Sequence, residues 1–214
     1  PTVGPAVAAT AERLLRRPLM PWQSELSDIA GEYDPTSGRF AYTDVVVVVP
    51  RRAGKTLLTL ATLLQRALIR PMVRGWYTAQ TREDAARQFR LEWSPLLDRL
   101  ERRRVVTVRR SNGSETITVD PRGRVSTVQL FAPTASAIHG QNADIVVVDE
   151  VWWFTVEDGA DLEAGIRPAQ LTRPLRQRWW ITAGGMRTDA NDPDATETFL
   201  DGLMDRGRAA VESG

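Results

Sequence analysis

The strongest constraint on the fold is a short apolar run that leads directly into a glycine-containing loop and a helix. Residues 44–49 read Asp-Val-Val-Val-Val-Val, and Pro50 ends the run. The run is too short for a helix, and its β-branched residues favour a strand. Because the apolar residues are continuous rather than alternating, we expect both faces of this strand to be buried, as in a parallel sheet that helices cover. Helical spacing follows over residues 56–69.

Strands and helices alternate along the rest of the chain, which predicts an α/β fold with a central, mainly parallel β-sheet flanked by helices. Further buried strands are expected at residues 75–79, 144–149 and 178–182. Three segments with period-two alternation, separated by turn sequences, predict a small antiparallel hairpin insertion at residues 105–131. The predicted helices span residues 10–17, 22–31, 81–103 and 192–210, and Pro95 should start a new turn or a kink in the third of them.

The composition excludes several classes of site. The 214 residues include no cysteine and a single histidine, His139, so disulfide frameworks, thiol catalysis and His-rich metal sites are excluded. The longest apolar run, five residues, is far below the roughly 20 needed to span a bilayer, and the N-terminus lacks a signal-peptide pattern. We therefore expect a cytosolic protein with no membrane partner. The net charge is only +1, but Lys55 is the one lysine among 28 basic residues.

Lys55 lies in a loop that has the features of a phosphate-binding site. The segment from Val49 to Thr56 reads Val-Pro-Arg-Arg-Ala-Gly-Lys-Thr, which matches the pattern Gly-x-x-x-x-Gly-Lys-Ser/Thr except at its first position. Gly54 permits close backbone approach, and the amides and dipole at the start of the helix favour an anion. Lys55 would contact the β- and γ-phosphates, and the Thr56 hydroxyl would bind Mg²⁺. Because the first glycine is missing, a chance Gly-Lys-Thr at a helix start remains the alternative.

Other residues of the same loop would also lie close to a bound nucleotide. Arg51 and Arg52 replace the small residues that are usual there, and they could neutralise the γ-phosphate or point to solvent. The predicted nucleotide-binding segment comprises Pro50, Arg51, Arg52, Ala53, Gly54, Lys55 and Thr56.

An acidic pair follows the buried strand at residues 144–149. Asp149 and Glu150 stand at its carboxyl end, the edge at which open α/β sheets bind ligands. Asp149 would hold Mg²⁺, and Glu150 would act as the general base for an attacking water. Alone, such a pair could be a strand that ends in solvated acids, but together with the loop it predicts magnesium-dependent nucleoside triphosphate hydrolysis.

Weaker signals surround these two motifs. Thr182 ends another strand at the same edge and could sense the γ-phosphate, and Gln23 could pair with adenine or be a surface glutamine. The arginines at 102–104, 109 and 110 form the densest basic patch, which could contact nucleic acid or be a solvated helix end. Trp152-Trp153-Phe154 is expected to pack in the core or at a subunit interface. The aspartates at 189, 192 and 194 are expected to form a turn and a helix cap rather than a metal site.

In these motifs the sequence resembles the ATPase half of tailed-bacteriophage large terminase subunits. An arginine-containing phosphate loop without its first glycine is what terminases typically show. The resemblance implies a P-loop NTPase of the ASCE, RecA-like type that uses ATP and Mg²⁺. It spans nearly the whole chain and rests on Pro21-Trp22-Gln23, Val49–Thr56, Trp76–Gln80, Val147–Glu150 and Thr182–Gly184.

The resemblance also implies a function and a division of the chain. In the family, a homo-oligomeric ring, a pentamer, sits at the procapsid portal in the host cytoplasm and pumps double-stranded DNA inward. The portal protein and the small terminase subunit would be partners. Residues 1–43 would form an N-terminal helical segment, 44–190 the P-loop ATPase core, and 191–214 a helix or linker toward a nuclease domain. Because that nuclease is absent from the sequence, we expect a fragment.

The resemblance assigns roles to individual residues. Gln23 would contact adenine, Arg51 or Arg52 would be the loop arginine, and Thr182, Ala183 and Gly184 would form the coupling motif. Family members often carry a trans-acting arginine before the glycine upstream of the acidic pair, and His139 occupies that position here. A neutral imidazole substitutes poorly for a guanidinium, so one of the loop arginines or of Arg102, Arg103 and Arg104 could serve instead.

Two other functions compete with the motor. A helicase-like, nucleic-acid-dependent ATPase needs a second RecA-like lobe, for which 214 residues leave no room. A regulatory module that binds nucleotide without turnover needs no general base, so Glu150 argues against it.

Overall fold

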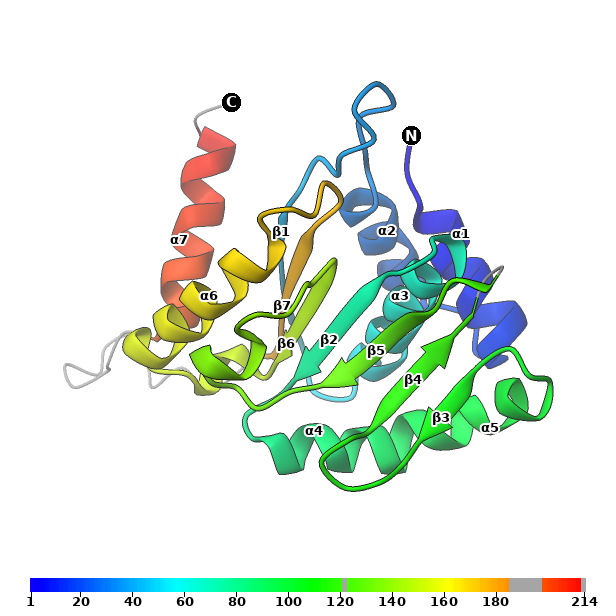
Figure 1. Ribbon diagram of the computed structural model, residues 1–214. Coiled ribbons are helices and arrows are strands. Elements are labelled where there is room, and N and C mark those ends of the chain that lie inside the picture. Colours follow the sequence, from blue (N-terminus) through cyan, green and yellow to red (C-terminus); the bar gives the residue numbers. More distant parts are fainter. Residues whose placement is uncertain (121–122, 185–197, 213–214) are drawn as a thin grey trace.

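The computed structural model describes residues 1–120, 123–184 and 198–212, and in these residues one seven-stranded β-sheet carries helices on both faces (Figure 1). The strand order is β1-β7-β6-β2-β5-β4-β3. The first five strands in this order are parallel, and β4 and β3 complete the sheet by antiparallel pairing. The strands are β1 Asp44–Val49, β2 Arg74–Thr78, β3 Thr107–Arg109, β4 Thr116–Val119, β5 Ser126–Leu130, β6 Ile145–Asp149 and β7 Gln177–Ala183.

The helices confirm most of the sequence predictions and add one that was missed. The described helices are α1 Gly4–Ala9, α2 Pro21–Ala30, α3 Lys55–Ile69, α4 Arg82–Gln88, α5 Ser94–Arg102, α6 Val156–Gln170 and α7 Phe199–Glu212. Helix α6 was not predicted, although Thr155 caps it through the N–H of Asp158 and acidic residues occupy its first turn. Part of the helix predicted over residues 192–210, and the three aspartates at 189, 192 and 194, lie outside the described residues.

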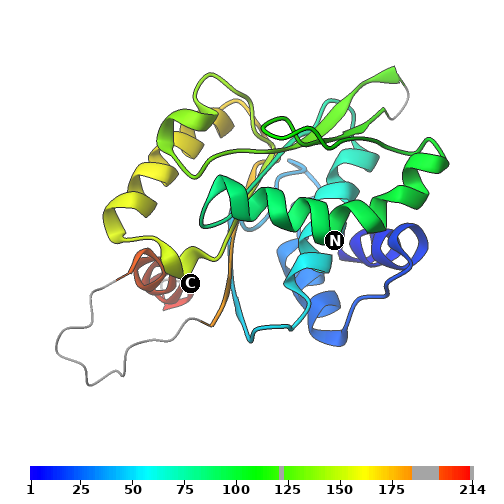
Figure 2. The same cartoon turned by 90° about the horizontal axis from the view of Figure 1, so that it is seen from below.

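Alternating strand residues build two hydrophobic layers, one on each face of the sheet. In β6, Ile145 and Val147 pack into the layer beneath α1–α5, whereas Val146 and Val148 pack against α6 and α7. Figures 1 and 2 show α6 and α7 on the face opposite α3. Because side chains alternate along a strand, Asp149 is in phase with Val147 and points toward the α3 face. The pleat of β6 therefore directs this carboxylate to the helix that follows the phosphate loop.

The valine strand β1 lies at an edge of the described sheet, and the prediction that both its faces are buried was wrong for the face that carries Val48. Val45 and Val47 are 7% and 4% exposed, whereas Val48 is 43% exposed. Strand β7 takes the interior place beside it, and all of its residues are buried. Because β7 separates β1 from β6, the phosphate loop faces the acidic pair across one intervening strand.

Two helical regions differ in detail from the prediction. The first helix begins at Gly4 and continues through a π-helical turn over Thr10–Leu15, so residue 10 was too late a start. The helix predicted over residues 81–103 is confirmed as α4, a π-helical turn over Phe89–Trp93, and α5. Pro95 lies in the first turn of α5, directly after the π-helical turn, which agrees with the predicted new turn. Thr81 caps α4 by accepting a hydrogen bond from the N–H of Asp84.

The predicted hairpin is part of the main sheet. Strands β3 and β4 pair antiparallel as expected, but β5 pairs parallel to β2 on its other side. The hairpin therefore extends the sheet away from the phosphate loop. Within the described residues no helix has the length and apolar character needed to cross a membrane.

Candidate nucleotide-binding site

The loop predicted to bind phosphate joins the end of β1 to the start of α3. Gly54 caps α3 with a φ of +93°, a left-handed conformation that glycine adopts without steric cost. A Cβ at this position would lie 2.7 Å from Nε2 of Gln23, so the close approach also requires glycine. Arg52 has a φ of +63°, which is uncommon for a residue with a side chain. The helix begins at Lys55, and its first backbone N–H groups are therefore available to an anion.

Gln23 lies beneath this loop and is fully buried. Its Oε1 accepts a hydrogen bond from the N–H of Met20 at 2.7 Å, and its Nε2 donates to the carbonyl oxygen of Gly54 at 2.9 Å. The side-chain amide thus ties the start of α2 to the phosphate loop. The alternative of a surface glutamine was wrong. The adenine contact stays a prediction.

The acidic pair stands at the carboxyl end of β6, beside the only lysine. The Nζ atom of Lys55 lies 3.1 Å from Oδ1 of Asp149 and 2.6 Å from Oε1 of Glu150. Glu150 has a left-handed backbone, with φ +57° and ψ +45°. Such strain costs on the order of 1–3 kcal/mol and is concentrated at functional sites. The turn lets two consecutive side chains reach the same lysine instead of opposite faces of the sheet.

Asp149 is held in a buried polar network. Its side chain is 5% exposed, and it accepts hydrogen bonds from the Tyr77 hydroxyl at 3.1 Å and from the Glu150 N–H at 2.9 Å. Burial raises the pKa of Asp149 above its usual value, the charge of Lys55 acts in the opposite direction, and Glu150 adds to the rise. Burial and the charge of Asp149 raise the pKa of Tyr77 well above its usual value, so Tyr77 stays protonated and donates.

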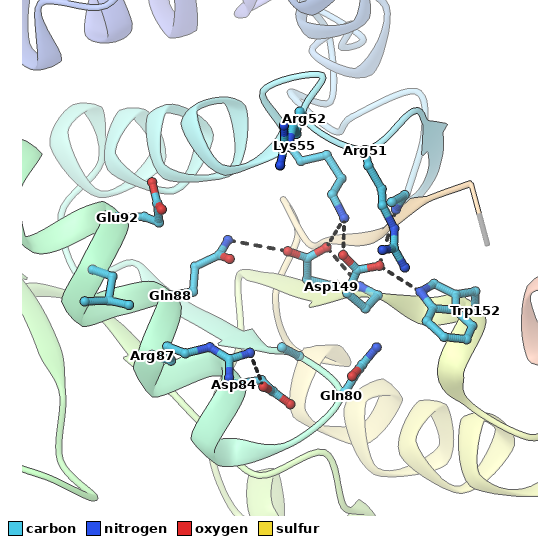
Figure 3. A pocket seen from close by; sticks show the side chains of 14 residues that line it. Arg51, Arg52, Lys55, Gln80, Asp84, Arg87, Gln88, Glu92, Asp149 and Trp152 are labelled. Carbon is cyan, nitrogen blue, oxygen red and sulfur yellow. Dashed lines mark hydrogen bonds and ion pairs between the residues drawn. The ribbon is translucent and has the colours of Figure 1, made fainter. Parts of the chain in front are cut away.

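Thr56 and Asp149 present two oxygen atoms that fit a magnesium ion. Nε2 of Gln88 on α4 lies 3.3 Å from Oγ1 of Thr56 and 3.5 Å from Oδ2 of Asp149. Figure 3 shows the contact with Asp149. The hydroxyl and the carboxylate are oxygen donors of the kind that Mg²⁺ binds. Mg²⁺ usually takes one or two protein oxygens and completes its shell with water and phosphate. Among the described residues, no group of three or more Asp, Glu, His or Cys side chains is placed to hold a metal ion.

Glu150 makes further contacts through its second oxygen. Oε2 accepts hydrogen bonds from Nε1 of Trp152 at 2.9 Å and from the N–H of Ala183 at 3.4 Å. The packing predicted for the three aromatic residues holds for Phe154, which is buried. Trp153 is 56% exposed, so it does not pack in the core, and its place at a subunit interface stays a prediction. Trp152 is half-buried, and its indole N–H bonds to the acid.

A cavity of about 420 Å³ lies between the phosphate loop, the acidic pair and α4. Figure 3 shows the side chains of α4 directed toward it from the side opposite Lys55. The predicted site residues that line the cavity are Arg51, Arg52, Lys55, Asp149, Glu150 and Ala183. The helix and the turn after it contribute Asp84, Arg87, Gln88, Leu91 and Glu92.

Three other predicted residues, Thr182, Gly184 and His139, do not line this cavity. The Thr182 side chain is fully buried, and its hydroxyl donates to the carbonyl oxygen of Ala183 at 2.8 Å. The N–H of Gly184 donates to the carbonyl oxygen of Val49, which ties the end of β7 to β1. His139 is exposed, follows a short helical turn over Ala135–Ile138, and does not line the cavity.

The basic patch contains different arginines in the structure than the sequence predicted. Arg110 forms ion pairs with Asp98 and Glu101 at 2.8 and 2.9 Å, so its charge is compensated. Arg102, Arg103 and Arg104 are exposed at the end of α5. Arg99 and Arg16 join them: the pKa of Arg99 is lowered by partial burial and by the charges of Arg103, Arg16 and Arg102. Arginines from two distant segments therefore share one positive surface.

Sequence reasoning missed three residues of the site: Tyr77, Gln88 and Trp152. Gln88 carried a usable signal, because it lies four residues after Asp84 on a helix that starts at the carboxyl edge of the sheet. Tyr77 was assigned to a strand, but nothing in the sequence indicates that its hydroxyl reaches Asp149. Trp152 follows Glu150 by two residues, and only the left-handed turn brings its ring back.

These features define the class of the protein and then its family. A strand that ends in a Gly-Lys-Thr loop, with an Asp-Glu pair at the end of the next strand but one, defines a P-loop NTPase fold. Residues 46–163 match the family described as terminase large subunit, T4likevirus-type, N-terminal. The match covers more than half of the chain, and the chain belongs to this family. A comparison with curated proteins gives no match.

Solved structures agree on the fold. The HK97 bacteriophage large terminase matches with a TM-score of 0.73 at 19% identity, over 98% of this chain and 42% of that chain. The large terminase of a thermophilic bacteriophage, in complex with ADP, matches with a TM-score of 0.55 at 17% identity, over 77% of this chain and 39% of that chain. The Thermus phage P74-26 large terminase ATPase domain gives 0.55 at 15% identity, over 80% of this chain and 67% of that chain. The chain thus spans less than half of each of the first two proteins.

Proposed function

We propose that this chain is the ATPase part of a motor that packages double-stranded viral DNA into a procapsid, with ATP and Mg²⁺ as cofactors. The observation that carries the proposal is the convergence of Lys55, Asp149 and Glu150 on one cavity of about 420 Å³. That volume lies within the roughly 300–1,000 Å³ that is common for small-molecule sites. Membership of the terminase family favours the packaging reaction over other uses of a P-loop.

The residues that line the cavity divide the reaction between them. The ammonium group of Lys55 moves from the two acids to the β- and γ-phosphates of ATP. The backbone N–H groups at the start of α3 bind the same phosphates. Thr56 and Asp149 would hold Mg²⁺, which would neutralise charge on the phosphates. Glu150 accepts the proton of the attacking water. Arg51 and Arg52 line the cavity and neutralise the γ-phosphate.

The end of β7 is placed to pass the state of the nucleotide to the rest of the motor. The N–H of Ala183 contacts Glu150, and the N–H of Gly184 bonds to Val49, which precedes the phosphate loop. A shift of Glu150 when the γ-phosphate leaves would therefore reach Ala183, and a shift of the phosphate loop would reach Gly184 through Val49. We assign Thr182, Ala183 and Gly184 the coupling role on this ground.

Phosphate release from ATP, measured with Mg²⁺ and with or without DNA, tests the proposal. We expect turnover that double-stranded DNA stimulates, at protein concentrations that allow assembly. Stimulation by single-stranded DNA alone would favour the helicase-like ATPase. Tight binding of ATP with no phosphate release under any of these conditions would favour the regulatory module.

The surface formed by Arg16, Arg99 and the arginines 102–104 is the proposed contact with the DNA backbone. Exposed arginines bind phosphates, and each neutralised phosphate steepens the dependence of affinity on salt. Charge reversal at Arg102, Arg103 and Arg104 is expected to weaken DNA binding and to flatten the plot of log K against log salt by about one unit per lost contact. Fluorescence anisotropy with a labelled duplex at several salt concentrations measures both effects.

A second triple variant controls for the change in net charge. Arg39, Arg124 and Arg208 are exposed and lie outside this surface, so their reversal changes the total charge equally. If the two triple variants give equal slopes of log K against log salt, Arg102, Arg103 and Arg104 do not contact the DNA.

The assembly and its partners follow from the family rather than from the cavity. We propose a homo-oligomeric ring that works in the host cytoplasm with the portal protein and the small terminase subunit. His139 is exposed and lies outside its own cavity, as a residue acting on a neighbouring subunit must. The division at residues 43 and 190 is kept as part of this proposal, with residues 191–214 leading toward a nuclease domain.

A further inference from the structure

The two carboxylate oxygens of Glu150 have different partners. Oε1 lies 2.6 Å from Nζ of Lys55, and Oε2 accepts hydrogen bonds from the indole N–H of Trp152 at 2.9 Å and the N–H of Ala183 at 3.4 Å. Lys55 is a long, flexible side chain at the start of α3, whereas both donors to Oε2 are fixed near the ends of β6 and β7. Fixed donors thus hold Oε2 of the carboxylate, and the flexible Lys55 side chain occupies Oε1.

Nucleotide binding would change only one of these two sets of contacts. In the proposed function, on which this inference rests, Lys55 leaves Oε1 when its ammonium moves to the phosphates. Oε1 is then free to accept a proton from water. Oε2 keeps its two donors, and they decide where the basic oxygen points.

We propose that Trp152 is a positioning residue of the catalytic centre: its indole N–H holds Oε2 of Glu150 so that Oε1 faces the attacking water. The backbone supports this role. Glu150 is left-handed, and the N–H of Trp153 bonds back to the Glu150 carbonyl at 3.0 Å, so the turn over Val151–Trp153 returns the Trp152 ring to the acid. Trp152 lines the cavity itself, and Figure 3 shows its ring nitrogen directed toward the acidic pair.

Packing does not account for the position of Trp152. Its neighbours Val151 and Phe154 belong to the hydrophobic layer beneath α6 and α7, but Trp152 belongs to neither layer of the described core. Its aromatic partner is Trp153, at 5.6 Å between ring centres, and Trp153 is itself exposed. The shorter of the two hydrogen bonds to Oε2 comes from the indole, so the ring nitrogen is the stronger restraint on the carboxylate.

Three variants separate the N–H group from the aromatic surface. Trp152→Phe keeps an apolar ring and removes the donor. Trp152→His removes most of the ring area but retains a nitrogen, Nε2, at nearly the same distance from the backbone as the indole nitrogen. Trp153→Phe is the matched control, because Trp153 is the adjacent tryptophan and donates no side-chain hydrogen bond to a described residue.

The measurements are kcat for Mg-ATP, the dissociation constant for ATP-γ-S, and thermal unfolding. We expect Trp152→Phe to lower kcat about tenfold with nucleotide affinity unchanged, since a hydrogen bond to a charged group has roughly that effect. Trp152→His should recover most of kcat, and Trp153→Phe should match the wild type. Because a purely structural role predicts the opposite order for Phe and His, the pair discriminates even if one of them is less stable.

Three results would overturn the inference. Wild-type kcat in Trp152→Phe would show that the N–H is not needed, and a His variant as slow as the Phe variant would point to the ring surface. Weaker binding of ATP-γ-S at unchanged kcat would make Trp152 a nucleotide contact. Each of these leaves ATP hydrolysis itself intact, whereas absence of turnover in the wild type and in Trp153→Phe would remove the proposed function together with this inference.

Discussion

Replacement of Lys55 by alanine is expected to reduce ATP turnover by at least about 10²–10³-fold, the usual effect of removing one preorganised charge from a transition state. The ammonium of Lys55 contacts both acids, and in the proposed function it moves from them to the phosphates. Phosphate release under saturating Mg-ATP measures the effect. Arg39→Ala is the matched control, because it removes an exposed cation that lies outside the cavity.

The same replacement affects stability, and the two effects can be separated. Without Lys55, the buried Asp149 retains only hydrogen-bond donors, and an uncompensated buried carboxylate costs on the order of 1–3 kcal/mol or more. The double variant Lys55→Ala with Asp149→Asn should regain thermal stability and still lack turnover. If the double variant hydrolysed ATP, or Lys55→Ala alone kept wild-type turnover, the assignment of Lys55 and Asp149 would be wrong.

The strand–loop–helix unit was predictable because its signals are local. Five consecutive valines, a glycine and a helical pattern specify β1, the loop and α3 without reference to the rest of the chain. The place of β1 at the sheet edge was not predictable in this way. Apolar residues report a preference for burial, but the neighbours of a strand depend on pairing between segments that are distant in sequence, here β1 with β7.

The candidate site was predictable in its residue types and only partly in its contacts. The rule that ligands bind at the carboxyl ends of parallel strands placed Lys55 and the acidic pair at one edge. It could not foresee that Glu150 adopts a left-handed backbone, which decides where Trp152 lies. Gln88 depends on the path of the helix that crosses this edge, and that path is set by tertiary packing rather than by a local signal.

Gln23 illustrates a different limit. A motif-based reading assigns it to adenine, but the physical chemistry of a buried amide demands partners for both its ends. Met20 and Gly54 supply them. Whether a residue near a ligand contacts that ligand or holds the loop that does so is a matter of a few ångströms, and this distinction lies in tertiary packing.

Replacement of Glu150 by glutamine is expected to abolish turnover while ATP binding is retained or strengthened. The amide has the same shape but cannot accept the proton of the attacking water, and general bases contribute about 10²–10⁴-fold to rates. In the resting site the amide oxygen would still accept from Trp152, which turns the amide nitrogen toward Lys55, a second donor. Lys55 would then lose its 2.6 Å ion pair and be released for phosphate more easily.

Single-turnover phosphate release measures the loss of turnover, and calorimetric titration with ATP-γ-S measures the change in nucleotide affinity. Glu83→Gln is the matched control, because Glu83 is an exposed acid on α4 that does not line the cavity. Turnover within a few-fold of wild type in Glu150→Gln would mean that another group activates water. Weaker binding of ATP-γ-S would mean that Glu150 assists the loaded state, so that the resting ion pair with Lys55 does not compete with nucleotide as argued. The sign of the affinity change therefore reports the resting contact, and the turnover reports the chemistry.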